Sequence, residues 1–367
     1  MMITVDQLAR QLSGEVVGNR EREITNAKAL QKATSDDVTF VADDQNLRKL
    51  GKCLAGVVLV DAERLATAQQ LMALSDTTFI VVADPLTAFV ETMKLFRPQR
   101  ERPQIGISLH AHIDPTAKIG PNTNIHPGAV IGPDVVVGRD CDIHPGVVVG
   151  SGCQIGDQTT IHPHAVLYPE ITIGSRVLIH ANAVLGADGF GYRFEQGRFV
   201  KIPQLGTVRV DDDVEIGACT TIDRGMIGAT IIGEGTKLDN LVMIGHNCEL
   251  GKHNAFASQV GLAGSVTTGD YVRCAGQVGI ADHLHLGTGC TLAAKAGVHK
   301  NIPEGQTHVG SPAGPIDEQF KIIMAVQKAP EMRTQIRQLE RQVADLTKQL
   351  TELRDQMTES LTEATAA

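Results

Sequence analysis

The sequence is organised by an aliphatic residue that recurs at every sixth position. The period starts at Ile107 and runs to Leu185, resumes at Ile216, slips by four residues before Ile232, and then continues to Val298. A period of six fits neither a helix of 3.6 residues per turn nor a strand of alternating polarity. It is typical of a hexapeptide β-helix, in which each six-residue unit forms one short strand and one corner.

Four histidines form a second period. His126, His144, His162 and His180 are 18 residues apart, and each directly follows an isoleucine. Three hexads per coil form a triangular prism, so residues 18 apart stack along one edge at a strand spacing of roughly 4.8 Å. Such a column could hold a metal, but we favour stacked, solvated corner residues, because each histidine occupies an ordinary corner of its coil.

The composition limits the class of protein. Only 3% of residues are aromatic and 37 are glycine, so the core must be built from many small aliphatic layers. A net charge of −9 argues against nucleic-acid binding, which needs a basic surface. No apolar run reaches the roughly 18 residues that a transmembrane segment needs, and the start lacks the pattern of a signal peptide. We therefore expect a cytoplasmic protein.

The seven cysteines contain no Cys-x-x-Cys pair. Cys141, Cys153, Cys248 and Cys290 each lie four residues after an aliphatic residue of the period, where a small inward side chain fits. We expect buried thiols in a reducing compartment rather than zinc ligands or a redox pair.

The six-residue period is absent from the N-terminal part of the chain, and this divides the sequence before the C-terminal region into two parts. Residues 1–100 predict a small α/β domain, with strands at 36–43, 55–60 and 77–84 and helices at 4–12, 61–74 and 85–96. A charged, proline-bearing linker follows at 96–104. Residues 105–305 predict a parallel β-helix, so the fold class is mainly β, and the hexapeptide fold family coils left-handed.

The β-helix is interrupted by a glycine-rich insertion at 186–207. It holds four of the twelve aromatic residues of the chain, Phe190, Tyr192, Phe194 and Phe199. The insertion either packs on the flank of the rod or walls a binding cleft.

The C-terminal region, 316–367, predicts helices that end in a coiled coil. Its apolar residues follow alternating steps of three and four: Ile336, Leu339, Val343, Leu346, Leu350, Leu353 and Met357. This is a seam of a and d positions, whereas a helix packed on the rod would have a broader apolar stripe. We expect a homotrimer, because hexapeptide prisms usually associate around a threefold axis.

Because residues 18 apart stack along one edge, the sequence also predicts which polar residues lie close together. Gly264 lies 18 residues after His246 and His283 lies 37 after it, which predicts one groove with the two imidazoles roughly 10 Å apart. A histidine can take a proton from a nucleophile, and a backbone N–H near Gly264 can hold an oxyanion. Asp239, in the preceding hexad, could orient the imidazole. Because no Ser or Cys nucleophile accompanies these histidines, we expect direct acyl transfer.

Four motifs strongly resemble the UDP-3-O-acylglucosamine N-acyltransferase family: IGADGFGY, KIPQLGTV, VEIGACTTIDRG and KLDNLVMIGHNCELG. The resemblance covers about residues 3 to 325 and is most specific at 186–192 and 219–247. It implies transfer of a 3-hydroxyacyl group from acyl carrier protein to the 2-amine of a UDP-3-O-acylglucosamine in lipid A synthesis. It implies no cofactor beyond the thioester donor and no metal.

The resemblance also assigns roles to residues. It makes His246 the general base, Asp239 its partner, His283 a second active-site histidine and Gly264 the oxyanion donor. It implies substrate contacts at Asn240, Phe190 and Tyr192. The family's uridine-binding segment resembles Phe-x-x-Asn-x-x-Tyr. Here Phe40 is kept, while Asp43 and Asn46 replace the other two.

Several alternatives stay open. The nearest is the O-acyltransferase that acts earlier in the same pathway on UDP-N-acetylglucosamine. A hexapeptide carbonic anhydrase would need three histidines on zinc, and His246, His253 and His283 do not form a convincing set. A non-catalytic trimeric scaffold is the third.

Between 295 and 341 there are seven basic and five acidic residues, a mild excess that is compatible with docking of an acidic carrier protein. The preferred acyl chain length is left open.

Overall fold

The computed structural model describes residues 2–72, 76–98, 102–310 and 313–366. The chain divides into two compact units, Met1–Pro103 and Gln104–Ala367.

The first unit is a small α/β domain. Its five-stranded sheet has the order β2 (Glu15–Val17), β7 (Thr78–Val81), β6 (Val57–Val60), β5 (Asp37–Val41) and β4 (Asn26–Ala27), and a separate pair joins β1 (Ile3–Thr4) to β3 (Glu23–Ile24). The helices are α1 (Val5–Gln11), α2 (Asp44–Leu47), α3 (Ala62–Leu71) and α4 (Pro85–Phe96), with a 3-10 turn at Leu50–Lys52. The three predicted strands and three predicted helices are all present.

Local sequence explains these elements. Thr4 caps α1 with a reciprocal hydrogen-bonded box to Gln7, which satisfies two backbone donors at the start of the helix. The central strand β6 is buried on both faces, with Val57 packing in one apolar cluster and Val58 in another. An uninterrupted apolar strand of this kind is expected in a parallel sheet covered on both sides.

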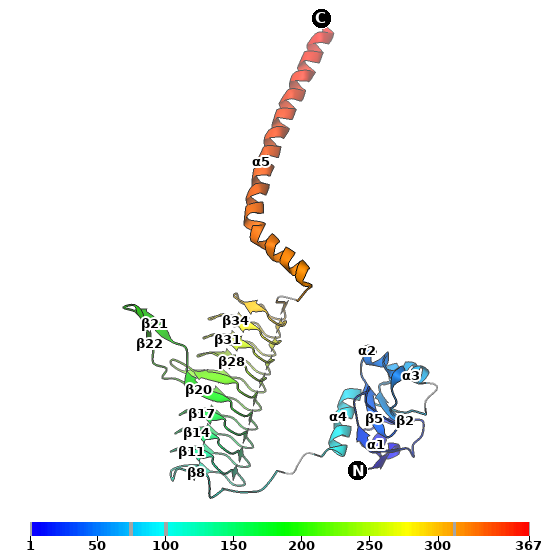
Figure 1. Cartoon of the computed structure of the whole chain (residues 1–367), viewed down its shortest axis with the longest axis vertical. Coiled ribbons are helices and arrows are strands. Elements are labelled where there is room, and N and C mark those ends of the chain that lie inside the picture. The colour runs from blue at the N-terminus through cyan, green and yellow to red at the C-terminus, as the bar shows by residue number, and fades with distance from the viewer. Residues whose placement is uncertain (1, 73–75, 99–101, 311–312, 367) are drawn as a thin grey trace. The chain divides into compact units, whose positions relative to one another are not determined.

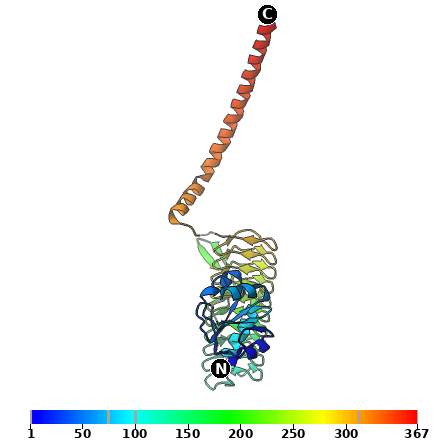
Figure 2. The same ribbon diagram turned by 90° about the vertical axis from the view of Figure 1, so that its right-hand side faces the viewer.

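The second unit contains a parallel β-helix of three long sheets, whose coils stack along its axis (Figures 1 and 2). Sheet 1 consists of β10 (Asn124–Ile125), β13 (Asp142–Ile143), β16 (Thr160–Ile161), β19 (Leu178–Ile179), β24 (Glu215–Ile216), β27 (Lys237–Leu238), β30 (Ala255–Phe256), β33 (Arg273–Cys274), β36 (Thr291–Leu292) and β38 (Thr307–His308). Sheet 2 consists of β8 (His112–Ile113), β11 (Val130–Ile131), β14 (Val148–Val149), β17 (Val166–Leu167), β20 (Val184–Asp188), β25 (Thr221–Arg224), β28 (Met243–Ile244), β31 (Gly261–Leu262), β34 (Gly279–Ile280) and β37 (Gly297–Val298). Sheet 3 consists of β9 (Lys118–Ile119), β12 (Val136–Val137), β15 (Gln154–Ile155), β18 (Thr172–Ile173), β23 (Thr207–Val210), β26 (Ala229–Ile232), β29 (Glu249–Leu250), β32 (Thr267–Thr268) and β35 (His285–Leu286).

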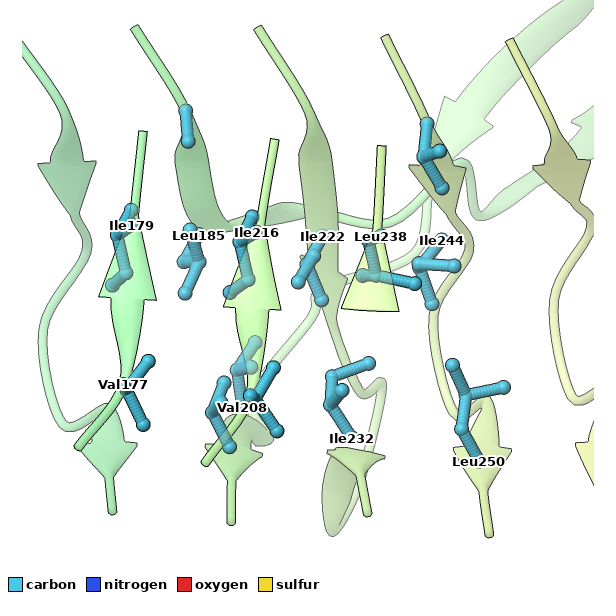
Figure 3. Packing of buried hydrophobic residues seen from close by; sticks show 14 of the residues in the cluster. Val177, Ile179, Leu185, Val208, Ile216, Ile222, Ile232, Leu238, Ile244 and Leu250 are labelled. Carbon is cyan, nitrogen blue, oxygen red and sulfur yellow. The ribbon is translucent and has the colours of Figure 1, made fainter. Parts of the chain in front are cut away.

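The aliphatic residues of the period fill the inside of the rod. Figure 3 shows successive members of one sheet, Ile179, Ile216 and Leu238, lying in register. They belong to one continuous buried cluster that extends from Ile125 to Ile302. The four cysteines predicted to be small core residues are buried, as are Cys53 and Cys274, whereas Cys219 is exposed.

The insertion is shorter than the sequence period indicates. The coil resumes at β23, where Val210 pairs with Ile173, one strand before the predicted restart at Ile216. The excursion forms a hairpin of β21 (Tyr192–Glu195) and β22 (Arg198–Lys201) that projects from the rod (Figure 1). The four-residue slip in the period corresponds to a widened turn between β25 and β26. The backbone of this turn is bonded to the end of the insertion, because the N–H of Leu205 donates to the carbonyl of Met226 at 2.9 Å.

The four periodic histidines lie where sheet 1 turns into sheet 2, which we call the histidine edge. Their rings stack at centroid distances of 4.6, 4.9 and 5.2 Å. Burial, followed by the neighbouring imidazoles, lowers the pKa of His144, and burial also lowers that of His162. The column is therefore stacked as predicted but is less solvated. Within the described residues, no group of His, Cys, Asp and Glu side chains could hold a metal ion.

The chain continues in one long helix, α5 (Ile316–Ala366), which contains Pro330. Every residue of the predicted seam is more than half exposed in the single chain, from Ile336 at 52% to Leu350 at 67%. In the described part of the chain, no helix has the length and apolar character to cross a membrane.

Candidate active site on one edge of the rod

A cavity of about 290 Å³ lies along the edge where sheet 2 turns into sheet 3, which we call the cavity edge. It is lined by Phe190, Asp223, Met243, Gly245, His246, Leu262, Ala263, Gly264, Asp282 and His283. The structure thus brings four of the predicted site residues together: Phe190, His246, Gly264 and His283. The turns of three successive coils supply the last three, because β28, β31 and β34 are neighbours in sheet 2.

The hydrogen bonds around His246 define its tautomer. Its Nδ1 lies 3.2 Å from Oδ1 of Asn247. That oxygen accepts from the N–H of Met226 at 2.9 Å, while Nδ2 of Asn247 donates to the carbonyl of Ile227 at 2.8 Å. Since the amide orientation is fixed by both partners, Oδ1 is an acceptor and Nδ1 of His246 must carry the proton. Nε2 is left as the basic nitrogen.

The basic nitrogen lies against Gly264. A Cβ at this position would be 2.6 Å from both Nε2 and Cε1 of His246, so only glycine lets the imidazole approach the turn. The turns are also joined by backbone bonds, from Ser265 N–H to His246 C=O at 2.8 Å and from His283 N–H to Gly264 C=O at 3.1 Å. The two histidines are therefore held at fixed offsets on either side of Gly264.

The N–H of Gly264 is available for a ligand. In the described residues it donates no hydrogen bond. Pro115, Pro133 and Pro169, which lack an N–H, occupy the same turn position in earlier coils of this edge. The β-helix therefore does not need this donor for its own backbone pairing, and it can serve as an oxyanion donor.

The insertion forms one wall of the cavity. A Cβ at Gly189 would lie 2.5 Å from Cβ of His246, so the inserted chain passes directly beside the imidazole. Phe190 lines the cavity although 84% of its surface is exposed, and its ring meets that of Tyr192 edge-on at 5.0 Å. Of the two expectations for this segment, the structure favours the cleft wall.

Asp223 and Asn247 are members of the site that the sequence interpretation missed. Asp223 ends the motif TTID, is 7% exposed and lines the cavity beside His246. Burial raises the pKa of its carboxyl to about 6, although the nearby His246 acts in the opposite direction. The sequence signal that could have identified Asp223 is an acidic residue at the end of a buried strand, in the coil before His246.

Asp239 and Asn240 lie elsewhere in the single chain. They belong to the histidine edge, where they line a separate cavity of about 690 Å³ together with His180, Glu215 and Lys237. Asp239 accepts a hydrogen bond from the N–H of Asn240 at 2.7 Å, and Asn240 Oδ1 accepts from Ala218 N–H at 2.7 Å. Asp239 lies seven residues before His246. Because the chain reaches the next edge of the rod about every six residues, the two side chains lie on different edges. Within one chain, Asn247 rather than Asp239 therefore orients His246.

The predicted uridine contacts have structural partners in the first unit. Phe40 lies on β5 and its ring packs on Phe89 at a centroid distance of 4.7 Å. Asp43 caps α2, because its carboxylate accepts from the backbone and side-chain amides of Asn46 at 2.7 and 2.8 Å. These hydrogen bonds hold the pKa of Asp43 below its usual value. Asp43 and Asn46, the two residues that depart from the Phe-x-x-Asn-x-x-Tyr pattern, thus form a helix cap.

Comparison with known proteins identifies similar sequences over most of the chain. Residues 21–95 match the family described as UDP-3-O-(3-hydroxymyristoyl) glucosamine N-acyltransferase, LpxD, and residues 116–151 and 152–187 match bacterial transferase hexapeptide repeats. The UDP-3-O-acylglucosamine N-acyltransferase of Syntrophotalea carbinolica is 41% identical over 340 residues, which cover 93% of this chain and 96% of that protein. That of Methylobacterium nodulans is 47% identical over 144 residues, a match that spans 39% of this chain and only 41% of that protein.

A solved structure shows the same architecture. The UDP-N-acetylglucosamine acyltransferase of Arabidopsis aligns with a TM-score of 0.52 at 24% identity and covers 56% of this chain and 71% of that one. At this identity the likeness concerns the fold alone. It confirms the predicted class, a mainly β protein built on a left-handed parallel β-helix with hexapeptide repeats.

Proposed function

Because the chain belongs to the UDP-3-O-acylglucosamine N-acyltransferase family, we propose that it transfers a 3-hydroxyacyl group from acyl carrier protein to the 2-amine of a UDP-3-O-acylglucosamine. The reaction is a step of lipid A synthesis and would take place in the cytoplasm. It requires no cofactor, since a thioester is already an activated acyl donor.

The observation that carries the proposal is the position of the free Nε2 of His246 against Gly264, inside a cavity. His246 accepts a proton from the sugar amine as the nitrogen attacks the thioester carbonyl. The N–H of Gly264 donates to the oxyanion of the tetrahedral intermediate. Collapse of the intermediate breaks the C–S bond, and the thiol leaves with the proton that His246 carried. His283, two coils further, helps to hold the intermediate.

We propose that the active assembly is a homotrimer. Support comes from the seven exposed apolar residues of the α5 seam, which need a partner of matching periodicity. Asp239 and Asn240 lie on an edge adjacent to the cavity edge of the same rod. Around a threefold axis, neighbouring rods would bring these two edges face to face, so Asp239 would complete the site of an adjacent chain.

The α/β domain is proposed to bind the uridine of the acceptor through Phe40. Support comes from the match of residues 21–95 to the family and from the partial exposure of Phe40, whose neighbours in strand β5 are buried. In this chain the cap formed by Asp43 and Asn46 replaces the family's other two contacts, so we expect weaker binding of the nucleotide.

The decisive experiment incubates the purified chain with UDP-3-O-(3-hydroxyacyl)glucosamine and a 3-hydroxyacyl thioester of acyl carrier protein. Mass spectrometry should detect the doubly acylated sugar nucleotide and the free carrier thiol. His246→Ala should abolish product formation without changing the oligomeric state. Transfer to UDP-N-acetylglucosamine instead would support the O-acyltransferase alternative, and retained activity in His246→Ala would refute the assigned base.

A further inference from the structure

Asp223 presents a buried carboxylate to the cavity from the coil that precedes His246. The strands β25 and β28 pair through Ile222 and Ile244, so the residue after Ile222 lies one strand spacing below the turn of His246. Asp223 is 7% exposed and lines the cavity. The cavity edge therefore carries two basic groups at one place, an imidazole and a carboxylate.

The carboxylate of Asp223 lacks a partner in the described protein. Among the residues that the structure describes, no group donates a hydrogen bond to it. The adjacent Arg224 turns away and donates to the carbonyls of Gly186 and Pro169 at 2.9 and 2.7 Å. Asp188, a nearby acid, is paired with Lys201. A largely buried carboxylate that accepts no hydrogen bond is poorly solvated, so its position in the cavity lining points to a cationic ligand.

The chemistry of the proposed acceptor supplies such a cation. An amino sugar carries a protonated primary amine at neutral pH, and an ammonium nitrogen has three protons. The amide product keeps one of them. Two protons must therefore leave the nitrogen, one before it can attack and one afterwards, whereas a hydroxyl acceptor loses only one. A single imidazole can hold only one proton at a time.

We propose that Asp223 binds the acceptor's ammonium group and takes the first of its two protons, and that His246 takes the second. This inference rests on the proposed function. The ammonium loses a proton to the Asp223 carboxylate, which leaves a neutral amine hydrogen-bonded to a carboxylic acid. The amine lone pair then forms the C–N bond, and His246 Nε2 removes the second proton. The C–S bond breaks, the thiolate takes that proton from His246, and Asp223 releases its own to solvent with the product.

The charged and titratable groups around Asp223 are compatible with this role. His246 lines the cavity in the next coil, Asp188 raises the pKa of Asp223, and His283 and Asp282 line the same space. The buried thiol of Cys248 has a pKa raised to about 12, so it remains neutral and does not compete for the proton. A carboxylate in the cavity lining favours binding of an ammonium group over a hydroxyl group, which makes Asp223 a specificity determinant for N-acylation.

The test compares the wild-type chain with Asp223→Asn, which keeps the shape but cannot accept a proton, and Asp223→Glu, which keeps the carboxylate. The matched control is Asp134→Asn, an exposed turn residue of the same edge in a distant coil. Acyl transfer to the amine acceptor is measured between pH 6 and 9 for each chain, and thermal melting checks that each one folds. We expect Asp223→Asn to lose about 100-fold in kcat/KM at pH 7.

The pH profile separates a proton acceptor from a structural residue. Without Asp223 the enzyme can use only acceptor that is already neutral in solution. The deficit of Asp223→Asn should therefore shrink by about tenfold per pH unit as the amine deprotonates. Asp223→Glu should retain more activity than Asp223→Asn, whereas a purely steric role predicts the reverse order. A deficit that stays constant with pH, or a reversed order, would overturn the inference while leaving the proposed function intact. Absence of product with the wild-type chain would instead refute the function.

Discussion

The Nδ1 atom of His246 lies 3.2 Å from Oδ1 of Asn247, whose amide is itself fixed by the backbone of the widened turn at 225–228. This relationship gives a corner histidine a defined tautomer, with Nε2 left to accept a proton. It also links His246 to the widened turn between β25 and β26, because Met226 and Ile227 lie where the six-residue period slips by four. The irregularity of the coil is thus part of the site.

The first prediction concerns this pair. Asn247→Gly should lower kcat about 100-fold with little change in KM, because the imidazole loses the acceptor that holds Nδ1–H. Glycine is chosen since Asn247 has a φ of 59°, which glycine adopts without strain. Steady-state kinetics for both substrates measure the effect. Asn182→Gly, a left-handed turn residue on the histidine edge with a φ of 61°, should behave like the wild type.

The second prediction concerns the glycine beneath the base. Gly264→Ala should reduce kcat by at least tenfold while the chain stays folded, because the new Cβ displaces the imidazole from its position. Gly51→Ala is the control, because Gly51 lies in the first unit and a Cβ there would meet only Leu71 O at 3.6 Å. Activity assays and thermal melting of both variants distinguish a local effect from unfolding. Equal activity of the two would contradict the assigned geometry.

The third prediction concerns stability and pH. The pKa of Asp223 is raised from 3.8 to about 6 by burial, so its ionisation destabilises the folded state above pH 6, by up to about 3 kcal/mol. The unfolded carboxyl ionises first, so the penalty grows as pH rises from about 4 to 6 and disappears below pH 4. Asp223→Asn should therefore raise Tm at pH 8 and leave it unchanged at pH 4. Melting curves at the two pH values test this, and a lower Tm at pH 8 would show that the carboxylate has a stabilising partner.

The fourth prediction concerns the α5 seam. Leu346→Glu places a charge at a d position, so the proposed trimer should weaken markedly and dissociate at protein concentrations where the wild type remains associated. Lys348→Gln changes a residue that is 79% exposed and two positions from the seam, and it should have no effect. Light scattering coupled to size exclusion measures the mass of each. If Leu346→Glu remains a stable trimer, the rod alone must hold the assembly together.

The sequence by itself determined the rod and most of one edge. A six-residue period is a local property, since each hexad needs only one inward aliphatic residue and one corner, and stacking three hexads per coil follows from it. The offset of 18 residues then places Gly264 above His246, and the offset of 37 places His283 one position further round the turn. The structure brings all three into one cavity, as that arithmetic requires.

The tertiary structure alone decided which carboxylate and which wall belong to this cavity. Proximity in sequence suggested Asp239, but corners six residues apart put it on another edge. Asp223 reaches the site because β25 pairs directly with β28, and the widened turn between them makes its offset from His246 longer than the regular period predicts. Likewise the path of Gly189 beside the imidazole depends on how a long insertion folds back over the coil, for which no local period exists. Regular repeats fix position by counting, whereas irregular segments are placed only by the contacts they make.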